Sequence, residues 1–345
     1  MRGQRRFIVV GVVLLAILVL LSGFHRVKVI QFDAGPMAVD LPFGNTRDAV
    51  GRAVGIDGRV YGPLTFAANG QSLVVADTYR QRLLTIEGGR MTEIPTLNQL
   101  VEDVQMGAKN RLFVADNRGL AVWMIARGRR TKLLQFRHLS GYTEALWHLA
   151  LGANRKLYLE MVRFGHGTFS AQLDEYSMTG RFLRRLATAA GGRVEPLTPL
   201  KGSLVSEPVR NFQVSPQGEL YVEPAPTPGK TRAVTVYSSD GRFLRRIELR
   251  CPVPLHHAEL LGVSGQGWIY LGANLTDPYQ ARVLVANGDG HIIADIHVSA
   301  VPVHAATYGR VLPSGILYLD QSSPKRYRLA TYRPVVRRVW RWTGF

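Results

Sequence analysis

The stretch NGQSLVVAD (Asn69–Asp77) decides the fold, because the chain repeats its pattern five more times. Each copy has a turn rich in Gly, Asn or Pro, followed by a short apolar strand: AKNRLFVAD (108–116), ANRKLYLE (153–160), PQGELYVE (216–223), GQGWIYLG (265–272) and LPSGILYLD (312–320). The strands begin at residues 73, 112, 157, 220, 269 and 317, so the average spacing is roughly 49 residues. Repeats of about this length, made of short strands, are typical of propeller blades.

Further strand-like runs surround each copy. In the first repeat, PLTFAANG (63–70) precedes the central strand and RLLTI (82–86) follows it. A fourth run follows in later repeats, for example RFLRRL (181–186) and RFLRRI (242–247), and helical periodicity is absent beyond the N-terminal run. The sequence therefore predicts an all-β, six-bladed β-propeller with four-stranded antiparallel blades, preceded by one N-terminal transmembrane helix. Two stacked β-sandwiches are the alternative, but they would not produce six similar units.

The first unit resembles an NHL repeat. Nine residues match the pattern of that family: Gly55, Asp57, Gly58, Gly62, Pro63, Ala76, Asp77, Thr78 and Arg82. The second unit keeps only Ala115, Asp116 and Asn117, and later units keep only the order of strands. The resemblance implies a propeller. It implies less about activity, because this fold includes ligand-binding sensors, RNA binders, scaffolds and metal-dependent hydrolases and lyases.

The N-terminus has a basic start and then an uncharged run from Phe7 to Phe24. A helix of this length nearly spans a bilayer, so we expect a signal anchor over residues 1–26, with a cleaved signal peptide as the alternative. Residues 27–54 then form a linker or a ring-closing strand, and residues 55–345 form the propeller. Three arginines before the span weakly favour a cytoplasmic N-terminus, which predicts a single-pass protein of the cell membrane with its propeller outside the cytoplasm.

The formal net charge is +18. Such a surface attracts anionic membranes, wall polymers or nucleic acid. Part of this charge lies in the hexamer GRFLRR, which occurs at residues 180–185 and again at 241–246. Neither face of the hexamer is purely basic, so we interpret both copies as outer strands whose arginines protect exposed sheet edges. Cys251 is the single cysteine of the chain, which excludes an intramolecular disulfide.

Polar residues of differing type lie where the inner strand of each blade is expected to begin. We call this end of the central channel the channel mouth, and its candidate ligand-binding residues are Asp103, His148, Asn211, Arg210, Glu259 and Trp147. A set of Asp, His and Asn could hold Ca²⁺ or Zn²⁺ and activate a water molecule, although no metal-binding motif has a specific spacing here. The acids that end the second strands repeat evenly and predict turn-capping carboxylates: Asp77, Asp116, Glu160, Glu223 and Asp320.

The sequence favours a membrane-anchored binding or scaffold module over an enzyme, because no catalytic signature is present. The expected partners are the membrane, through the N-terminal helix, and a protein or an envelope polymer. Two alternatives stay open. One is a metal-dependent hydrolase or lyase with its site at the channel mouth, and the other is an RNA-binding, NHL-like domain if the propeller is cytoplasmic. Placement outside the cytoplasm disfavours a nucleic-acid partner.

Overall fold

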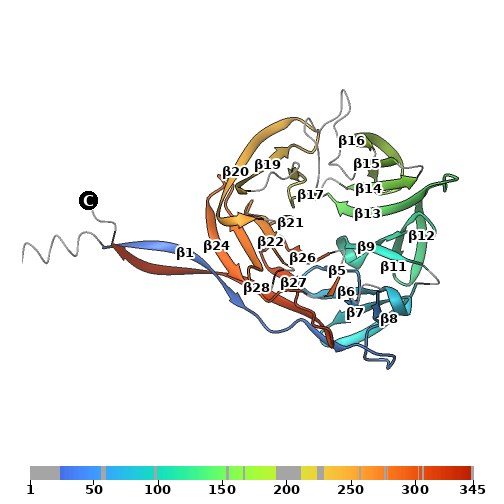
Figure 1. Ribbon diagram of the computed structural model, residues 1–345, viewed down its shortest axis with the longest axis horizontal. Coiled ribbons are helices and arrows are strands. Elements are labelled where there is room, and N and C mark those ends of the chain that lie inside the picture. Colours follow the sequence, from blue (N-terminus) through green and yellow to red (C-terminus); the bar gives the residue numbers. More distant parts are fainter. Residues whose placement is uncertain are drawn as a thin grey trace, which may run out of the picture. The chain divides into compact units, whose positions relative to one another are not determined.

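The computed structural model describes residues 24–55, 60–96, 99–152, 155–165, 168–191, 211–223, 229–255, 258–275, 277, 279–301, 303–304 and 307–342. Between Ala34 and Arg333 these residues form a ring of six antiparallel sheets (Figure 1). The sequence-based prediction of an all-β six-bladed propeller with four-stranded blades is confirmed.

Five blades are built from consecutive strands, with the innermost strand first in the chain. The first contains β5 (Thr65–Ala68), β6 (Ser72–Asp77), β7 (Arg82–Glu87) and β8 (Arg90–Pro95); the second β9 (Val101–Met106), β10 (Leu112–Asp116), β11 (Ala121–Ala126) and β12 (Arg129–Gln135); the third β13 (Thr143–Leu151), β14 (Lys156–Gly165), β15 (Thr168–Ser177) and β16 (Phe182–Gly191). The fourth contains β17 (Asn211–Val214), β18 (Leu220–Glu223), β19 (Gly229–Tyr237) and β20 (Phe243–Leu255); the fifth β21 (Ala258–Val263), β22 (Ile269–Ala273), β23 (Arg282–Ala286) and β24 (Ile292–His297).

The sixth blade joins the two ends of the propeller. Its first three strands are β26 (Gly309–Val311), β27 (Leu317–Asp320) and the start of β28 (Arg326–Trp342), and its fourth is β2 (Val39–Pro42) from the N-terminal part. Residues 335–340 belong to β28 and do not form the outer strand of this blade. The ring therefore closes through β2, which takes that outer position.

The segment 27–33 belongs to β1 (Phe24–Ala34), which pairs with the far part of β28. These strands form a separate unit. Within it, Arg337 Nη2 lies 3.3 Å from both carboxylate oxygens of Asp33. Residues 1–23, which carry most of the predicted anchor, lie outside the described residues. Among the residues that are described, no helix is long and apolar enough to cross a membrane.

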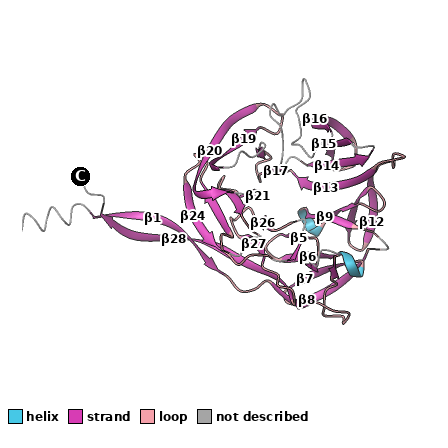
Figure 2. Cartoon of the chain, viewed as in Figure 1, coloured by secondary structure: helices cyan, strands magenta, loops and turns pink. Residues whose placement is uncertain are grey.

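Three further short strands and two single helical turns complete the described elements (Figure 2). The strands β3 (Ala53–Val54), β4 (Val60–Tyr61) and β25 (Val303–His304) form a small sheet of their own. The turns are the 3₁₀ segments η1 (Thr78–Arg80) and η2 (Ala108–Asn110).

The core lies between neighbouring blades. The second strands β6, β10, β18 and β22 are buried at every residue, because both of their faces pack against side chains of other strands and blades. One cluster, for example, joins Ala67 and Val74 of the first blade to Val104 and Val114 of the second. This burial on both sides explains why the repeated motif is a continuous apolar run, whereas the outer strand β8 is mostly exposed or half-buried.

The repeated hexamer GRFLRR begins in the hairpin between the third and fourth strands. In the third blade Ser177 N donates to Arg181 O and Gly180 N donates to Ser177 O, and the fourth blade repeats both bonds at Ser238. Gly180 and Gly241 have φ values of +83° and +87°, in the left-handed region that favours glycine. A Cβ atom on Gly180 would lie 2.1 Å from the carbonyl oxygen of Leu133 in the preceding blade. Gly180 therefore permits two blades to pack closely.

We predict that Gly180→Ala destabilises the propeller much more than Gly128→Ala. Both glycines have positive φ, but a Cβ atom on Gly128 would meet no atom within 4 Å. Gly128→Ala should therefore cost only the backbone strain, about 1 kcal/mol, whereas Gly180→Ala adds a clash with backbone and should cost about 3 kcal/mol. Denaturant unfolding of both variants measures the difference. Equal losses would show that the close approach at Gly180 has no energetic weight.

Candidate functional site

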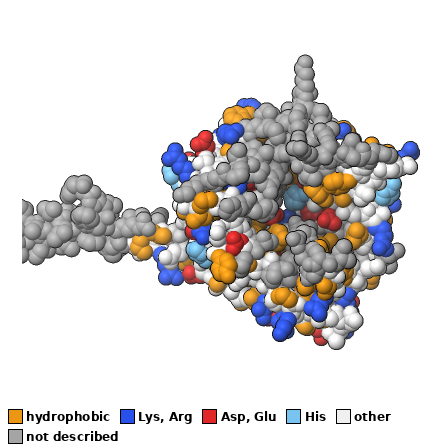
Figure 3. Space-filling model, viewed as in Figure 1, with side chains coloured by type: hydrophobic (Ala, Val, Ile, Leu, Met, Phe, Trp, Pro, Cys, Tyr) orange, Lys and Arg blue, Asp and Glu red, His pale blue; other side chains and the backbone are white. Residues whose placement is uncertain are grey.

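The inner strands place five polar side chains together in the ring: Thr65 of β5, Asp103 of β9, His148 of β13, Arg310 of β26 and Thr307, just before β26. We call these five residues the central network. They come from the first, second, third and sixth blades. Figure 3 shows a hollow in the middle of the ring in which histidine and acidic atoms are visible.

Asp103 lies at the centre of this network, with an exposed fraction of only 1%. Its Oδ1 accepts hydrogen bonds from Thr65 Oγ1 at 3.0 Å and from Val104 N at 2.8 Å. Its Oδ2 accepts a bond from Leu149 N at 2.9 Å, and His148 Nδ1 lies 3.1 Å from the same oxygen. Both oxygens of the buried carboxylate are therefore fully occupied.

Arg310 supplies the charge that balances Asp103. Its Nη2 forms an ion pair with Asp103 Oδ1 and also donates to Thr307 Oγ1 at 3.3 Å, while its Nε donates to Phe66 O at 3.2 Å. The hydroxyl groups of Thr65 and Thr307 lie 3.0 Å apart and share a hydrogen bond. The guanidinium group is thus fixed by partners from the first and second blades and from its own blade.

The pKa of Asp103 reports the balance of these contacts. Burial alone would raise it, but the charge of Arg310 and the hydrogen bond and charge of His148 outweigh burial and bring the pKa to about 2. Asp103 is therefore a permanent anion at neutral pH. It stabilises the network and does not itself exchange a proton.

His148 is the member of the network with unused hydrogen-bonding capacity. Because its Nδ1 faces Asp103, the neutral ring carries its proton on Nδ1 and presents a lone pair on Nε2. Nε2 is buried and has no hydrogen-bond partner among the described residues. The His148 and Phe212 rings form a T-shaped pair with centroids 5.0 Å apart, which helps to fix the orientation of the imidazole. The arrangement leaves one oriented, buried acceptor without a described partner.

Trp147 precedes His148 and lies at an irregularity of the strand pairing. The register between β13 and β14 shifts between Leu146 and His148, which is typical of a β-bulge that redirects a side chain. The Trp147 side chain is 41% exposed and contacts the ring of Phe164, with centroids 6.1 Å apart. An exposed indole next to an oriented histidine can stack against the apolar face of a ligand.

Glu102 adds a group that titrates near neutrality. Burial, and then the charge of Asp103, raise its pKa to about 7, although a hydrogen bond from Asn117 Nδ2 at 3.1 Å acts in the opposite direction. Burial also raises the pKa of Glu160 to about 7, and Glu160 lies opposite His148 in the strand pairing. Both carboxyl groups, Glu102 beside Asp103 in sequence and Glu160 opposite His148, can therefore be protonated at physiological pH.

The evenly repeated acids have structural roles where their contacts are described. Asp116 Oδ1 accepts bonds from the backbone N–H groups of Leu100, Arg118 and Gly119, and Asp320 Oδ1 accepts one from Ser322 N. Asp77 accepts a bond from Gly51 N at 2.9 Å and one from Arg82 Nε at 2.9 Å. The prediction of turn-capping carboxylates is confirmed for Asp116 and Asp320, whereas Asp77 binds the earlier Gly51 and the side chain of Arg82. For Glu160 and Glu223 it stays a prediction.

The central network defined above does not include Glu259, and the side chain of Asn211 lies outside what the structure describes. Asn211 begins β17 opposite Glu223, and the half-buried Glu259 of β21 lies opposite Gly272. Arg210 lies outside the described residues. Sequence reasoning missed Thr65, Thr307 and Arg310.

The missed residues were close to the positions that the repeat alignment indicated. Asp103 and His148 stand nine residues before Leu112 and Leu157, the first residues of their apolar motifs. The same spacing in the first and sixth blades gives Leu64 and Tyr308, each one residue from Thr65 and Thr307. A shift of one residue moves a side chain to the other side of a strand, so the alignment pointed to the wrong neighbour. Arg310 could have been found from the sequence, because a charged residue inside a short inner strand is unusual.

The described channel mouth does not fit the calcium or zinc site that we considered. No group of three or more His, Cys, Asp or Glu side chains within the described ranges could hold a metal ion. Both oxygens of Asp103 are engaged, and Arg310 already provides the positive charge beside it. A divalent cation would have to displace this guanidinium group against charge repulsion.

No family model and no curated protein sequence matches the chain. Solved structures do match it in fold. A gluconolactonase from Xanthomonas campestris is 16% identical with a TM-score of 0.51, over 89% of this chain and all of that one. A virginiamycin B lyase from Staphylococcus aureus is 11% identical with a TM-score of 0.46, over 90% and 88% of the two chains. A calcium-binding regucalcin from Agrobacterium tumefaciens is 11% identical with a TM-score of 0.45, over 76% and 87%.

The similarity to the gluconolactonase, at 16% identity, establishes a shared fold and nothing about activity. The NHL resemblance of the first unit is not confirmed by a family match and stays a prediction.

We predict that Asp103→Asn destabilises the protein by about 3–5 kcal/mol at pH 7, because it leaves Arg310 buried without a counter-charge. The matched control is Asp40→Asn, which removes a carboxylate that is 39% exposed and pairs with Arg326 and Arg328, and which should cost at most about 1 kcal/mol. Denaturant unfolding of both variants measures the two losses. Similar losses of unfolding free energy in the two variants would contradict the claim that Asp103 contributes more to stability than an exposed carboxylate.

The ion pair of Asp103 and Arg310 also predicts how the stability of the protein depends on pH. The folded-state pKa of Asp103, about 2, lies below its ordinary value of 3.8. Its contribution to stability is therefore complete above pH 3.8 and is lost as the pH falls through about 2. The stability difference between wild type and Asp103→Asn should accordingly shrink only in that acidic window.

Proposed function

We propose that the protein is a membrane-anchored propeller outside the cytoplasm that binds a small hydroxyl-bearing ligand, such as a sugar or a sugar-derived ring, at its channel mouth. The observation that carries the proposal is the buried Asp103, which orients His148 so that Nε2 is left without a partner among the described residues. Trp147 offers an exposed aromatic face beside it. One ring acceptor and one aromatic face match a ligand with hydroxyl groups on one side and C–H groups on another.

A second candidate function is acid–base catalysis on such a ligand. A histidine held by a buried carboxylate, with its second nitrogen free, is suited to act as a general base. Glu102, with its pKa raised to about 7, is suited to return a proton. The structural similarity to a gluconolactonase makes a sugar lactone the first substrate to test. The Arg310–Asp103 ion pair argues against a metal-dependent form of this reaction at the described residues.

We expect the full-length protein to bind at least one member of a panel of neutral mono- and disaccharides and D-glucono-1,5-lactone in isothermal titration calorimetry. His148→Asn keeps a donor toward Asp103 but removes Nε2, and Trp147→Ala removes the aromatic face. Each should weaken binding about tenfold or more. Tyr279→Ala is the control, because this side chain is 92% exposed and lies in another blade.

Two outcomes would overturn the proposal: no ligand in the panel binds, or Tyr279→Ala weakens binding as much as the two channel variants do. The lactone also separates the two candidate functions. Acid release from the lactone, followed in a pH-stat and abolished in His148→Asn, would establish an enzyme. Binding without acid release supports a binding module.

The membrane anchor and the position of the propeller outside the cytoplasm rest on the N-terminal sequence alone, with its basic start and apolar run. We expect protease added to intact cells to degrade the propeller while a cytoplasmic marker stays protected. Release of the whole protein by a carbonate wash would contradict the anchor. A propeller protected in intact cells and degraded only after lysis would place it in the cytoplasm and favour the RNA-binding alternative.

A further inference from the structure

The turns at one end of the ring carry an excess of positive charge. Within each blade the first and third strands run away from the channel mouth, so the turns that follow these strands lie together at the opposite end. We call this end the far end. Turns of the sixth, first and second blades meet there around a hollow of about 690 Å³, whose lining includes Leu312, Asn69 and Lys109.

Two neighbouring blades supply most of this charge. The four far-end turns of the second and third blades, residues 107–111, 126–129, 152–156 and 178–181, contain no Asp or Glu in their sequence. Exposed Lys and Arg side chains occur in all four turns: Lys109, Arg111, Arg127, Arg129, Arg155 and Arg181. We call these six residues the basic face.

The basic face is not neutralised within the blades that carry it. The deeper cations of the third blade do have partners there, since Lys156 and Arg184 both pair with the buried Glu175. None of the ion pairs between described residues includes a residue of the basic face. Six exposed charges of one sign create a positive potential that attracts an anionic partner.

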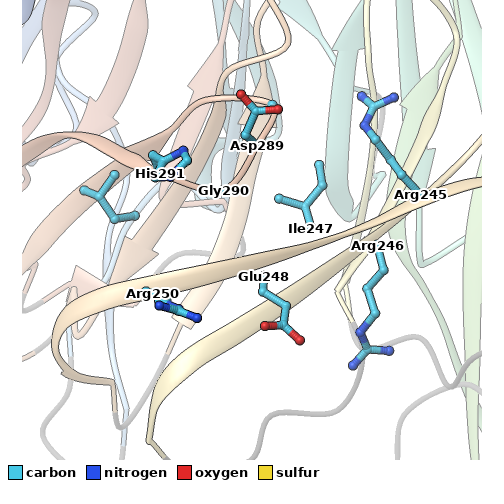
Figure 4. Close-up of a pocket in the computed structure, with 10 residues that line it drawn as sticks. Arg245, Arg246, Ile247, Glu248, Arg250, Asp289, Gly290 and His291 are labelled. Carbon is cyan, nitrogen blue, oxygen red and sulfur yellow. The ribbon is translucent and has the colours of Figure 1, made fainter.

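The other far-end turns with described charges do not extend the basic face. The turn of the first blade, residues 87–90, contains one charge of each sign, and the equivalent turn of the fourth blade carries Asp240 as well as Arg242. In the fifth blade this turn carries Asp289 and neither Lys nor Arg. Figure 4 shows Asp289 and His291 on that turn, beside β20. The excess of positive charge is therefore concentrated on two adjacent blades.

The chain enters and leaves the propeller at the far end. In the sixth blade Tyr332 of β28 is paired with Leu317, the residue that follows the far-end turn of that blade. Gly35 N donates to Thr331 O at 2.7 Å, which places the start of the propeller at the same level. From there the chain continues into β1 on one side and into the far part of β28 on the other. The predicted anchor precedes β1, so it is joined to the propeller at the end that carries the basic face.

We propose that the basic face binds the anionic headgroups of the membrane in which the N-terminal segment is anchored. The inference rests on the anchor proposed above: β1 has 11 residues and spans at most about 37 Å, which keeps the far end within that reach of the bilayer. Each Lys or Arg near an anionic lipid surface strengthens binding about fivefold. In this arrangement the channel mouth, at the opposite end, faces away from the membrane and stays accessible to its ligand.

Single-stranded nucleic acid is a weaker match for the basic face. Such ligands are usually held in a groove with aromatic side chains on which the bases stack. The four turns contain no Phe, Tyr or Trp. Phe182, which follows Arg181, is 51% exposed but already packs edge-to-face on Tyr176, with ring centroids 5.6 Å apart. An array of anionic headgroups requires only charges spread over a surface, and an exposed Phe beside them suits the headgroup boundary.

The test follows an environment-sensitive dye on the full-length protein, mixed with vesicles of phosphatidylcholine alone or with phosphatidylglycerol added. The dye is attached at Thr179→Cys, an exposed position in a turn of the basic face, because the single native cysteine, Cys251, is buried. We expect a blue shift of its emission only on vesicles with phosphatidylglycerol. The shift should disappear when salt is raised from about 0.1 M to about 0.5 M, which screens the charges. A dye at Tyr279→Cys, in the loop between β22 and β23 at the channel-mouth end, should not respond.

Charge-removing variants locate the contact. The variant Arg111→Gln/Arg129→Gln/Arg181→Gln should lose most of the shift, because it removes three charges for which no ion-pair partner is described. The matched control removes three exposed cations at the channel-mouth end and should keep the shift: Arg47→Gln/Arg137→Gln/Lys325→Gln. Replacement of the same three arginines by lysine should retain it, and the salt dependence of the wild type tests the proposal even if a variant fails to fold.

Flotation of the protein with neutral vesicles reports the anchor separately, because these vesicles carry no net charge for the basic face. A protein that floats with both kinds of vesicle but shows no shift at residue 179 would overturn the proposal and retain the anchor. A salt-sensitive shift on phosphatidylglycerol without flotation on neutral vesicles would support the basic face and contradict the anchor. An equal shift on neutral vesicles, or an equal loss in the control variant, would also overturn the proposal. So would binding of an oligothymidylate that is lost in the far-end variant while the vesicles give no response, which would assign the face to nucleic acid.

Discussion

The buried carboxylate of Asp103 is the constraint on which the centre of the propeller depends. An ion taken out of water is costly unless every lone pair has a partner, and here the partners come from four of the six blades. A shift of any one of those blades would leave a charge or a donor unsatisfied. The centre of the ring is therefore fixed by a polar network, whereas the faces of the blades are held together by apolar packing.

This constraint also determines what chemistry the channel mouth can perform. Asp103 cannot serve as a proton carrier, because Arg310 and His148 hold it as an anion. Asp103 instead fixes the His148 ring, and in the described part of the network Nε2 of this ring is a buried acceptor without a partner. Hydrogen bonding and proton transfer follow from that nitrogen. The same geometry is therefore compatible with binding and with acid–base catalysis. Which of the two occurs depends on whether the bound ligand has a reactive group.

The sequence predicted the blades well because the second strand of each blade is buried. A strand buried on both faces requires a continuous apolar run, and this run recurs in all six blades. It placed a possible ring-closing strand only within residues 27–54, because β2, which takes the outer position of the sixth blade, matches none of the repeats. At the site it found Asp103 and His148, which stand out by type. Thr65 and Thr307 do not stand out by type, and their hydrogen bonds to Asp103, to Arg310 and to each other identify them.

The two copies of GRFLRR show why a motif alone does not determine a function. The hairpin geometry is the same in both, since it depends on a glycine at positive φ and on local backbone bonds. The arginines differ because their environment is set by the neighbouring strand, where Glu175 faces Arg184 but Val236 faces Arg245. That strand lies several residues away in sequence and directly opposite in space. In the first copy Arg184 therefore joins its blade to the turn of the next blade, whereas in the second copy Arg245 turns back to Tyr221 and Glu219 of its own blade, although the hexamers are identical.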